Sequence, residues 1–209
     1  MFFTTACSCC ARPGPDPCAG CVDAMVVLAE SDLGDLDPML GEVFDRRLAL
    51  VAYDDTVAQL VAALKFRRVR SAVPWIATAM ADRLDAVGER PDVVTWVPAS
   101  RRGRRRRGYD QGEILGRAVA HRLGVRACAL LDRRDRDSQT GRDRAQRLDG
   151  PELVARRGRT ARLVAGAHVV VIDDVVTTGA SLAGAGAAVD DLGPSRLVGL
   201  ALAHRCFVP

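Results

Sequence analysis

The chain has 209 residues, which is enough for one substantial domain with a small additional module. Hydrophobic residues make up 48% of it and charged residues 27%, the composition of a globular protein, and its apolar runs are too short to cross a membrane. The first five residues lack the basic segment of a secretory signal. These features argue against membrane insertion and secretion, so we expect a cytoplasmic protein.

The basic residues are unevenly distributed along the chain. The net charge is only +4, yet six arginines fall within residues 101–107, which indicates a local anion site. Lys65 is the single lysine among 30 basic residues. We attribute this bias to the composition of a GC-rich genome rather than to function.

Five of the seven cysteines lie within the first 21 residues and predict a zinc knuckle. They contain two C-x2-C pairs, a spacing that brings four thiolates around one Zn²⁺: Cys7, Cys10, Cys18 and Cys21. Cys9 is an alternative ligand to Cys10. Disulfides and idle surface thiols are the other interpretations, and the absence of an export signal disfavours disulfides. A fully ligated zinc has no open position for chemistry, so this module would serve folding or recruitment.

Residues 1–47 are assigned to the knuckle and a connecting segment, and residues 48–209 to the main domain. A short strand is predicted over residues 48–53, and the polar residues 54–56 cap a helix that ends with positive charge at residues 65–68. A second helix fits residues 72–87. The apolar, β-branched run 93–97 is typical of a buried parallel strand.

The second half of the chain continues the alternation of strands and helices. Its predicted elements are a helix over 111–123 that Gly124 ends, a strand over 127–131, a polar loop over 132–150, a strand over 169–172, a helix over 180–192 and a strand over 196–203. This order predicts an α/β fold, a mainly parallel sheet with helices on both faces, whose ligand lies at the carboxyl ends of the strands. Cys128 and Cys206 lie in apolar stretches and are interpreted as buried structural thiols.

The most informative segment, VVVIDDVVTTGAS, spans residues 169–181. Two carboxylates, Asp173 and Asp174, follow the predicted strand and can accept hydrogen bonds from vicinal sugar hydroxyls. The start of the next helix offers free backbone N–H groups and hydroxyls to a phosphate, and its residues are Thr177, Thr178, Gly179, Ala180 and Ser181. The combination describes a ribose 5-phosphate site. The alternative is a capped helix beside two solvated aspartates, but an ordinary cap needs only one Ser or Thr.

With these pieces in this order, the chain resembles the ComF family, which has a type I phosphoribosyltransferase domain. The resemblance is carried by the knuckle, residues 63–66, 97–98 and 107–111, then Gln139, Arg144 and Arg147, and the segment 169–181. It implies binding of phosphoribosyl pyrophosphate with Mg²⁺, with Asp173 and Asp174 on the ribose and residues 177–181 on the 5-phosphate. The family often has Arg-Gly-Phe-Asn-Gln at residues 107–111, where this chain has Arg-Gly-Tyr-Asp-Gln, and the acceptor is left open.

In the implied fold, the loop after strand 93–97 faces the pyrophosphate and consists of Pro98, Ala99 and Ser100. The arginines that follow it, ending at Arg107 and Gly108, would then neutralise the leaving group together with Mg²⁺. The implied catalytic residues are Asp173, Asp174 and Arg107. Two alternatives apply to residues 101–107: a solvated charged face, or a groove for single-stranded DNA.

Three functions are therefore considered. The first is an enzyme that transfers the phosphoribosyl group to an unidentified nitrogen acceptor and releases pyrophosphate. The second is a competence factor for DNA uptake that binds single-stranded DNA and uses the sugar phosphate only as a ligand. The third is a regulator or assembly protein that contacts other DNA-uptake proteins. Tyr109 is the candidate stacking residue, Trp96 is interpreted as core, and His121, His168 and His204 as structural or surface residues.

Overall fold

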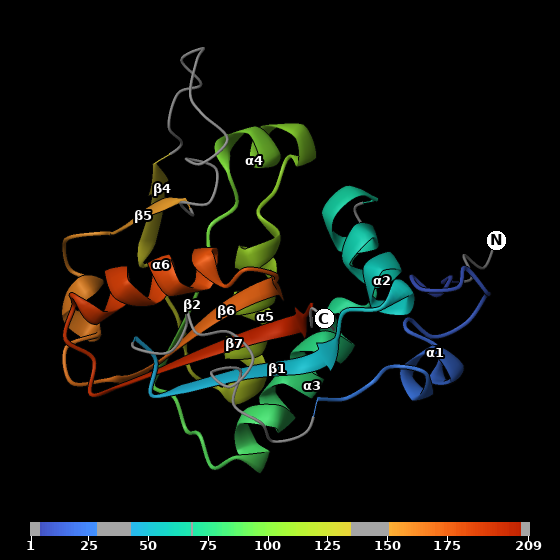
Figure 1. Cartoon of the computed structure of the whole chain (residues 1–209), viewed down its shortest axis with the longest axis horizontal. Helices are drawn as coiled ribbons and strands as arrows, with labels where there is room; N and C mark the ends of the chain where they lie inside the picture. Colours follow the sequence, from blue (N-terminus) through green and yellow to red (C-terminus); the bar gives the residue numbers. More distant parts are fainter. Residues whose placement is uncertain (1–4, 29–42, 68, 135–150, 206–209) are drawn as a thin grey trace.

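The computed structural model describes residues 5–28, 43–67, 69–134 and 151–205 (Figure 1). Its centre is a sheet of five parallel strands in the order β1-β7-β6-β2-β3. These strands are β1 (Arg46–Ala52), β2 (Val93–Trp96), β3 (Arg126–Ala127), β6 (His168–Val176) and β7 (Arg196–His204). Because all five run in the same direction, their carboxyl ends form one edge of the sheet.

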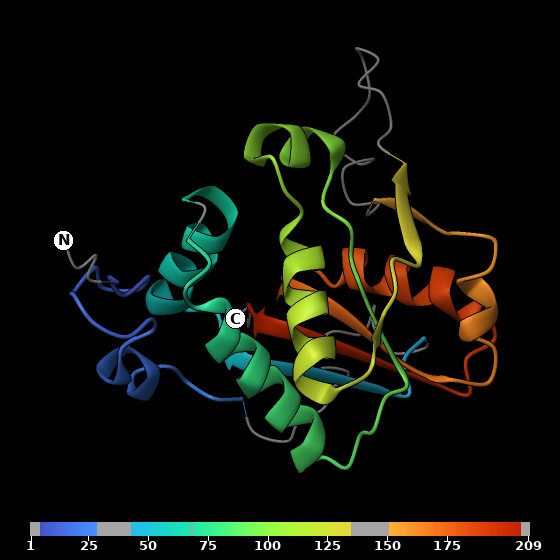
Figure 2. The same cartoon turned by 180° about the vertical axis from the view of Figure 1, so that it is seen from behind.

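Helices cover both faces of this sheet, which confirms the predicted fold class (Figures 1 and 2). The main helices are α2 (Asp55–Phe66), α3 (Val73–Ala86), α5 (Gln111–Leu123) and α6 (Ala180–Asp190). Apolar residues of α2, α3 and α5 share a core with Val170 and Ile172 of β6, whereas α6 packs with Val169 and Val171. Successive side chains of a strand point to opposite faces. Even-numbered positions in this part of β6 therefore face α2, α3 and α5, and odd-numbered positions face α6.

Most helix boundaries follow the local signals of the sequence. Asp54 caps α2 by accepting a hydrogen bond from the backbone N–H of Val57 at 2.8 Å. Gly124 ends α5 in the left-handed conformation, at a φ of 72°. Trp96 is 4% exposed and Cys128 7% exposed, which confirms both as core residues, while Cys206 lies outside the described residues. A short helix, α1 (Ala19–Asp23), and a 3-10 turn, η4 (Ala161–Leu163), complete the helical elements of the described ranges.

The prediction of one strand over residues 127–131 was wrong. The chain pairs with β2 only over β3, leaves the sheet, and starts a separate antiparallel hairpin of β4 (Leu131–Arg134) and β5 (Glu152–Ala155). The apolar run misled the prediction because Cys128, Leu130 and Leu131 remain buried where the chain passes from one sheet to the other. The predicted polar loop 132–150 was also wrong at its start, since residues 132–134 belong to β4. The rest of that loop lies outside the described residues.

The arginine-rich segment is a helix and not a loop. Helix α4 (Arg101–Arg107) begins where the Ser100 hydroxyl accepts a hydrogen bond from the N–H of Gly103 at 3.0 Å, and it ends at Gly108 with a φ of 80°. Arginine is a good helix former, and its long side chain can reach solvent from every side of a short helix. None of the helices in the described ranges is both long and apolar enough to cross a membrane.

A buried carboxylate ties together the starts of three neighbouring strands, at the edge opposite the carboxyl ends. Glu89 is 3% exposed and accepts hydrogen bonds from Nε and Nη2 of Arg196 at 2.8 and 2.6 Å. Nε of Arg46 lies 3.3 Å and Nε2 of His168 3.2 Å from its carboxylate oxygens. The hydrogen bonds from Arg196 lower the pKa of Glu89 and outweigh the effect of burial, which raises it.

We expect Glu89→Gln to lower the free energy of unfolding by about 1–3 kcal/mol at neutral pH, because it removes the charge that the two arginines face. Because folding lowers the pKa of Glu89, its ionised form stabilises the protein above the ordinary pKa of glutamate. The difference in the free energy of unfolding between the variant and the unmodified protein should therefore disappear as the pH falls through the folded-state pKa. Urea unfolding at neutral and acidic pH measures both effects. Asp85→Asn, which breaks the exposed pair with Arg90, is the control and should cost no more than about 0.5 kcal/mol. Equal losses in the two variants would contradict this assignment.

Candidate functional site

The acidic pair lies at the carboxyl end of β6, inside the strand rather than after it, because β6 continues to Val176. Asp174 is buried, and both of its carboxylate oxygens have protein partners. Oδ1 lies 2.8 Å from Nζ of Lys65, in the last turn of α2. Oδ2 accepts a hydrogen bond of 3.0 Å from Nε2 of Gln111, the first residue of α5. The structure therefore adds Lys65 and Gln111, which the sequence analysis did not assign to the site.

Asp173 has a different environment from its neighbour. Its position in β6 makes it face the side of α6 and the β4–β5 hairpin. Burial raises the pKa of Asp173 to about 8, and the negative charge of Asp174 acts in the same direction. A hydrogen bond of 2.7 Å from the backbone N–H of Asp174 to Oδ1 of Asp173 opposes this shift. Burial and the neighbouring charge therefore both disfavour the ionised form of Asp173.

The segment after β6 has the geometry of an anion site. Thr177 and Thr178 are exposed at its turn, and Gly179 precedes α6 with a φ of 71°, a left-handed conformation that favours glycine. Ala180 and Ser181 form the half-buried first turn of α6. No side chain caps this helix among the described residues. The alternative of an ordinary capped helix is therefore disfavoured, and the first N–H groups of α6 remain available to an anion.

The loop of Pro98, Ala99 and Ser100 is fixed beside this edge by a buried carboxylate. Oδ2 of Asp110 accepts a hydrogen bond of 2.8 Å from the N–H of Ala99, and its Oδ1 accepts one of 3.0 Å from the N–H of Gly112. A Cβ atom at Gly112 would lie 2.5 Å from the carbonyl oxygen of Val97, so only glycine fits this approach. Asp110, which the sequence analysis treated as a departure from the family pattern, thus joins the loop to the start of α5.

Helix α4 presents its arginines to solvent rather than to the acidic pair. Five of its six arginines are exposed, and Arg107 is half-buried. The Arg106 guanidinium lies 5.0 Å from the centre of the exposed Phe66 ring at the end of α2. In the described part of the chain, Arg107 makes no ion pair or hydrogen bond with Asp173 or Asp174. Its predicted catalytic role is therefore not supported by a contact with the acidic pair and stays a prediction.

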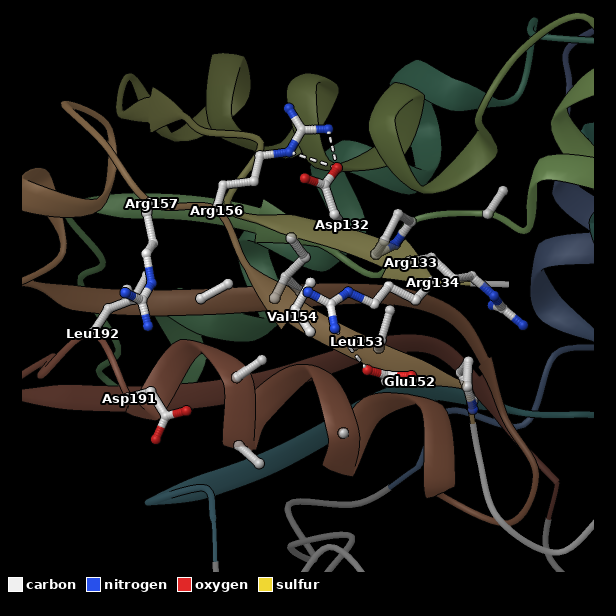
Figure 3. A pocket seen from close by; sticks show the side chains of 18 of the residues that line it. Asp132, Arg133, Arg134, Glu152, Leu153, Val154, Arg156, Arg157, Asp191 and Leu192 are labelled. Atoms are coloured by element: carbon white, nitrogen blue, oxygen red, sulfur yellow. Dashed lines mark hydrogen bonds and ion pairs between the residues drawn. The ribbon is translucent and has the colours of Figure 1, made fainter. Parts of the chain in front are cut away.

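A large hollow lies next to this site and not within it. A cavity of about 1230 Å³ lies between the β4–β5 hairpin and α6 and reaches Pro98 and Ala99 of the fixed loop (Figure 3). Figure 3 shows that several charged groups on its wall pair with one another: Arg156 with Asp132 at 2.8 Å, and Arg134 with Glu152 at 3.1 Å. Neither Asp173 nor Asp174 lines it. The chemistry of the acidic pair, rather than cavity size, therefore defines the candidate site.

The predicted cysteine cluster is present near the N-terminus. The Sγ atoms of Cys7, Cys10, Cys18 and Cys21 all lie within 4.8 Å of one another, so they could hold a metal ion. Cys9 is not part of this cluster and packs against the main core, which favours Cys10 as the fourth ligand. Burial would raise the pKa of Cys7, but hydrogen bonds from the backbone of Cys18, Cys10 and Cys9 lower it to about 6. Cys7 is therefore a thiolate at neutral pH, the form that binds metals.

This cysteine cluster is attached to the end of α2. The carboxylate of Asp16 accepts hydrogen bonds from the N–H and the hydroxyl of Ser8, both at 2.6 Å, and another from the hydroxyl of Ser71. Arg67, directly after α2, donates a hydrogen bond of 3.0 Å to the carbonyl oxygen of Ser8. The metal-binding module therefore contacts the chain two residues beyond Lys65.

Residues 110–205 match the phosphoribosyl transferase domain family. Two curated relatives are each named DNA utilization protein YhgH. The one from Salmonella typhimurium is 31% identical over 146 residues, which is 67% of this chain and 63% of the relative. The one from Salmonella typhi is 36% identical over 93 residues, 44% of this chain and 40% of the relative. The chain thus spans less than two thirds of the length of either relative.

Solved structures of phosphoribosyltransferase type are also similar. A purine phosphoribosyltransferase from Pyrococcus horikoshii is 22% identical, with a TM-score of 0.43 over 66% of this chain and 78% of that protein. The glutamine phosphoribosylpyrophosphate amidotransferase of B. subtilis is 19% identical, with a TM-score of 0.46 over 67% of this chain and 30% of that protein.

A parallel sheet with helices on both faces, an acidic pair at the end of β6 and the domain match together define a protein with a phosphoribosyltransferase-type domain. The four-cysteine cluster and the DNA utilization relatives narrow this class further. The chain therefore contains a phosphoribosyl transferase domain and is similar to DNA utilization proteins, which confirms the resemblance to the ComF family seen in the sequence.

Proposed function

We propose that this protein binds phosphoribosyl pyrophosphate with Mg²⁺ at the carboxyl edge of its sheet and transfers the phosphoribosyl group to a nitrogen acceptor. The observation that carries the proposal is the single strand-loop-helix unit of residues 168–190. It joins two carboxyl groups to an uncapped helix start. A ribose 5-phosphate needs both features, hydroxyl acceptors and a phosphate cradle, at the separation that one short loop provides.

Each part of the ligand then has a candidate partner. The 5-phosphate binds the N–H groups and hydroxyls of residues 177–181, and the ribose hydroxyls bind the acidic pair. The fixed loop of Pro98, Ala99 and Ser100 faces the pyrophosphate, and Arg107 and Gly108 follow it at the end of α4. The half-buried carboxyl group of Asp173 is an oxygen ligand of the kind that Mg²⁺ prefers, and bound Mg²⁺ supplies positive charge to the leaving pyrophosphate.

In the proposed reaction, the bond between the anomeric carbon and the pyrophosphate oxygen breaks, and its electron pair leaves with pyrophosphate. A bond to the acceptor nitrogen forms on the same carbon, and the acceptor loses a proton. Asp110 accepts a hydrogen bond from the Ala99 N–H and so fixes the loop of residues 98–100 in advance. Arg107 and bound Mg²⁺ would then offset the charge that develops on the departing oxygen.

The double variant Asp173→Asn with Asp174→Asn should abolish Mg²⁺-dependent binding of phosphoribosyl pyrophosphate in calorimetry, because amides lose the negative oxygens that face the ribose and the metal. The matched control is Asp190→Asn with Asp191→Asn, an exposed consecutive pair at the far end of α6. It should bind as the unmodified protein does. Undiminished affinity in the first variant would remove the site assignment.

We also propose that the four clustered cysteines hold one structural Zn²⁺. Elemental analysis of protein produced with sufficient zinc should find about one equivalent per chain, since four thiolates satisfy a tetrahedral Zn²⁺. Cys10→Ser should reduce the content to below about half an equivalent, whereas Cys9→Ser, the neighbouring control, should leave it unchanged. The reverse pattern would show that Cys9 is the ligand. We also propose that residues 1–47 form a separate module that contains the cysteine cluster, and that residues 48–209 form the main domain.

A second candidate function is binding of single-stranded DNA in DNA uptake, with other DNA-uptake proteins as partners. The exposed arginines of α4 favour it, because a basic surface of this kind suits the phosphate backbone of a nucleic acid. Both curated relatives carry the name DNA utilization protein. In this role the sugar-phosphate site would serve as a ligand or regulatory site.

This function predicts a salt-dependent affinity for an oligothymidine strand. Arg104→Ala, Arg105→Ala and Arg106→Ala together should reduce the slope of log K against log salt by about 2, at roughly 0.7 per lost phosphate contact. Fluorescence anisotropy at several salt concentrations measures the slope. A triple variant of equal charge, with alanine at the exposed Arg90, Arg122 and Arg126, should keep it. A flat slope in the unmodified protein would exclude this function.

A further inference from the structure

We infer that Lys65 is a ligand-binding residue of the acidic-pair site, and that its ammonium group contacts a phosphoryl oxygen of the bound sugar phosphate. This assignment rests on the proposed function, because it requires a phosphorylated sugar at the end of β6. Residues 63–66 are part of the resemblance to the ComF family, but that resemblance assigns no role to Lys65, and the domain match begins only at residue 110.

The composition of the chain gives the first reason. Lys65 is the only lysine among 30 basic residues, and it occupies the basic position that pairs with Asp174. A GC-rich genome explains the 29 arginines, but it does not explain why this one position is a lysine. An ammonium group is a compact point charge with three donors, whereas a guanidinium is planar and larger. A lysine fits where one cation must serve two acceptors in a narrow space.

The geometry gives the second reason. Nζ of Lys65 lies 2.8 Å from Oδ1 of Asp174, and the side chain is 24% exposed. This contact uses one of the three N–H donors, and the positive charge also acts on the neighbouring Asp173, whose pKa it lowers. Among the described residues, Asp174 is the partner within ion-pair distance. The remaining donors are therefore available at a partly open position beside the acidic pair.

The end of α2 is held on two sides, which positions Lys65 before any ligand binds. Arg67 donates hydrogen bonds to the carbonyl oxygens of Ser8 at 3.0 Å and Gln59 at 2.8 Å. The hydroxyl of Tyr109 donates to the carbonyl oxygen of Leu64. A side chain whose backbone is held in place loses less conformational freedom on binding, which favours a binding role.

Electrostatics gives the third reason. Two ionised carboxylates beside a polyanionic sugar phosphate would repel it. Here the ammonium of Lys65, 2.8 Å from Oδ1 of Asp174, offsets the charge of that carboxylate. Asp174, with both oxygens occupied, then acts as a positioning residue for Lys65 and Gln111. Both carboxyl groups can still accept hydrogen bonds from the sugar, because each carboxylate oxygen has more than one lone pair.

The single lysine permits a direct test on the unmodified protein. The ε-amino group of Lys65 and the terminal α-amino group are the only primary amines of the chain, so acetic anhydride labels two sites that mass spectrometry can follow separately. Saturating phosphoribosyl pyrophosphate with Mg²⁺ should slow the labelling of Lys65 at least about 10-fold, because the phosphoryl group covers the ammonium. The α-amino group is the internal control and should react at an unchanged rate.

A substitution gives the second measurement. Lys65→Met keeps the length of the side chain without its charge and should weaken binding of phosphoribosyl pyrophosphate with Mg²⁺ about 10- to 100-fold in calorimetry, the usual effect of losing a charged hydrogen bond. Lys65→Arg should recover only part of this loss. Arg122→Met, which removes a charge from an exposed pair with Asp82, is the control and should bind normally.

The possible outcomes separate this inference from the proposed function. If the unmodified protein does not bind phosphoribosyl pyrophosphate, the proposed function fails. If it binds but Lys65 is labelled equally fast with and without ligand, or if Lys65→Met binds as tightly as the unmodified protein, Lys65 is only a structural partner of Asp174 and the inference is overturned. Should Lys65→Met fail to fold, the labelling of the unmodified protein decides alone.

Discussion

The carboxylate of Asp174 joins three segments that are distant in the sequence, and the arrangement of the site depends on it. One oxygen contacts Lys65 at the end of α2, and the other accepts a hydrogen bond from Gln111 at the start of α5. Because a buried carboxylate is costly without partners, these contacts also constrain the two helices. The acidic pair is therefore asymmetric, with one member used by the protein and the other facing the side of α6.

The two edges of the sheet use charge in opposite ways. At the starts of the strands, Glu89 is surrounded by Arg196, Arg46 and His168, and the hydrogen-bonded network stabilises β1, β6 and β7 as a unit. At the carboxyl edge, charges are only partly compensated, and the first N–H groups of α6 have no side-chain cap in the described fold. An edge with compensated charges stabilises the fold, whereas an edge with available donors can bind a ligand.

Sequence patterns predicted those features whose causes are local. The apolar run before Asp173, the cap at Asp54 and the stop at Gly124 each act within a few residues. The helices were therefore predicted within a residue or two. The start of β6 was predicted equally well, although the strand continues four residues beyond the predicted end, to Val176. The cysteine cluster was predicted because two turns suffice to bring four thiols together. Hairpin β4–β5 and helix α4 were missed because polar, arginine-rich segments lack the apolar periodicity on which such predictions depend.

The contacts of Asp174 could not be predicted in this way, since 109 residues separate it from Lys65 and no pattern in the sequence links them. The single lysine was visible in the composition, but only the fold shows what it contacts.

If the four cysteines hold the proposed Zn²⁺, the same contacts connect this metal to a site that it does not touch. The cysteine cluster orders the backbone around Ser8, whose carbonyl oxygen accepts a hydrogen bond from Arg67. Arg67 lies two residues from Lys65, on the segment whose Leu64 carbonyl is bound by Tyr109. An unfolded knuckle would release one of these two restraints, and the side chain that compensates Asp174 would lose its fixed position. The role of the metal is then to maintain the end of α2, and its chemistry need not enter the reaction at all.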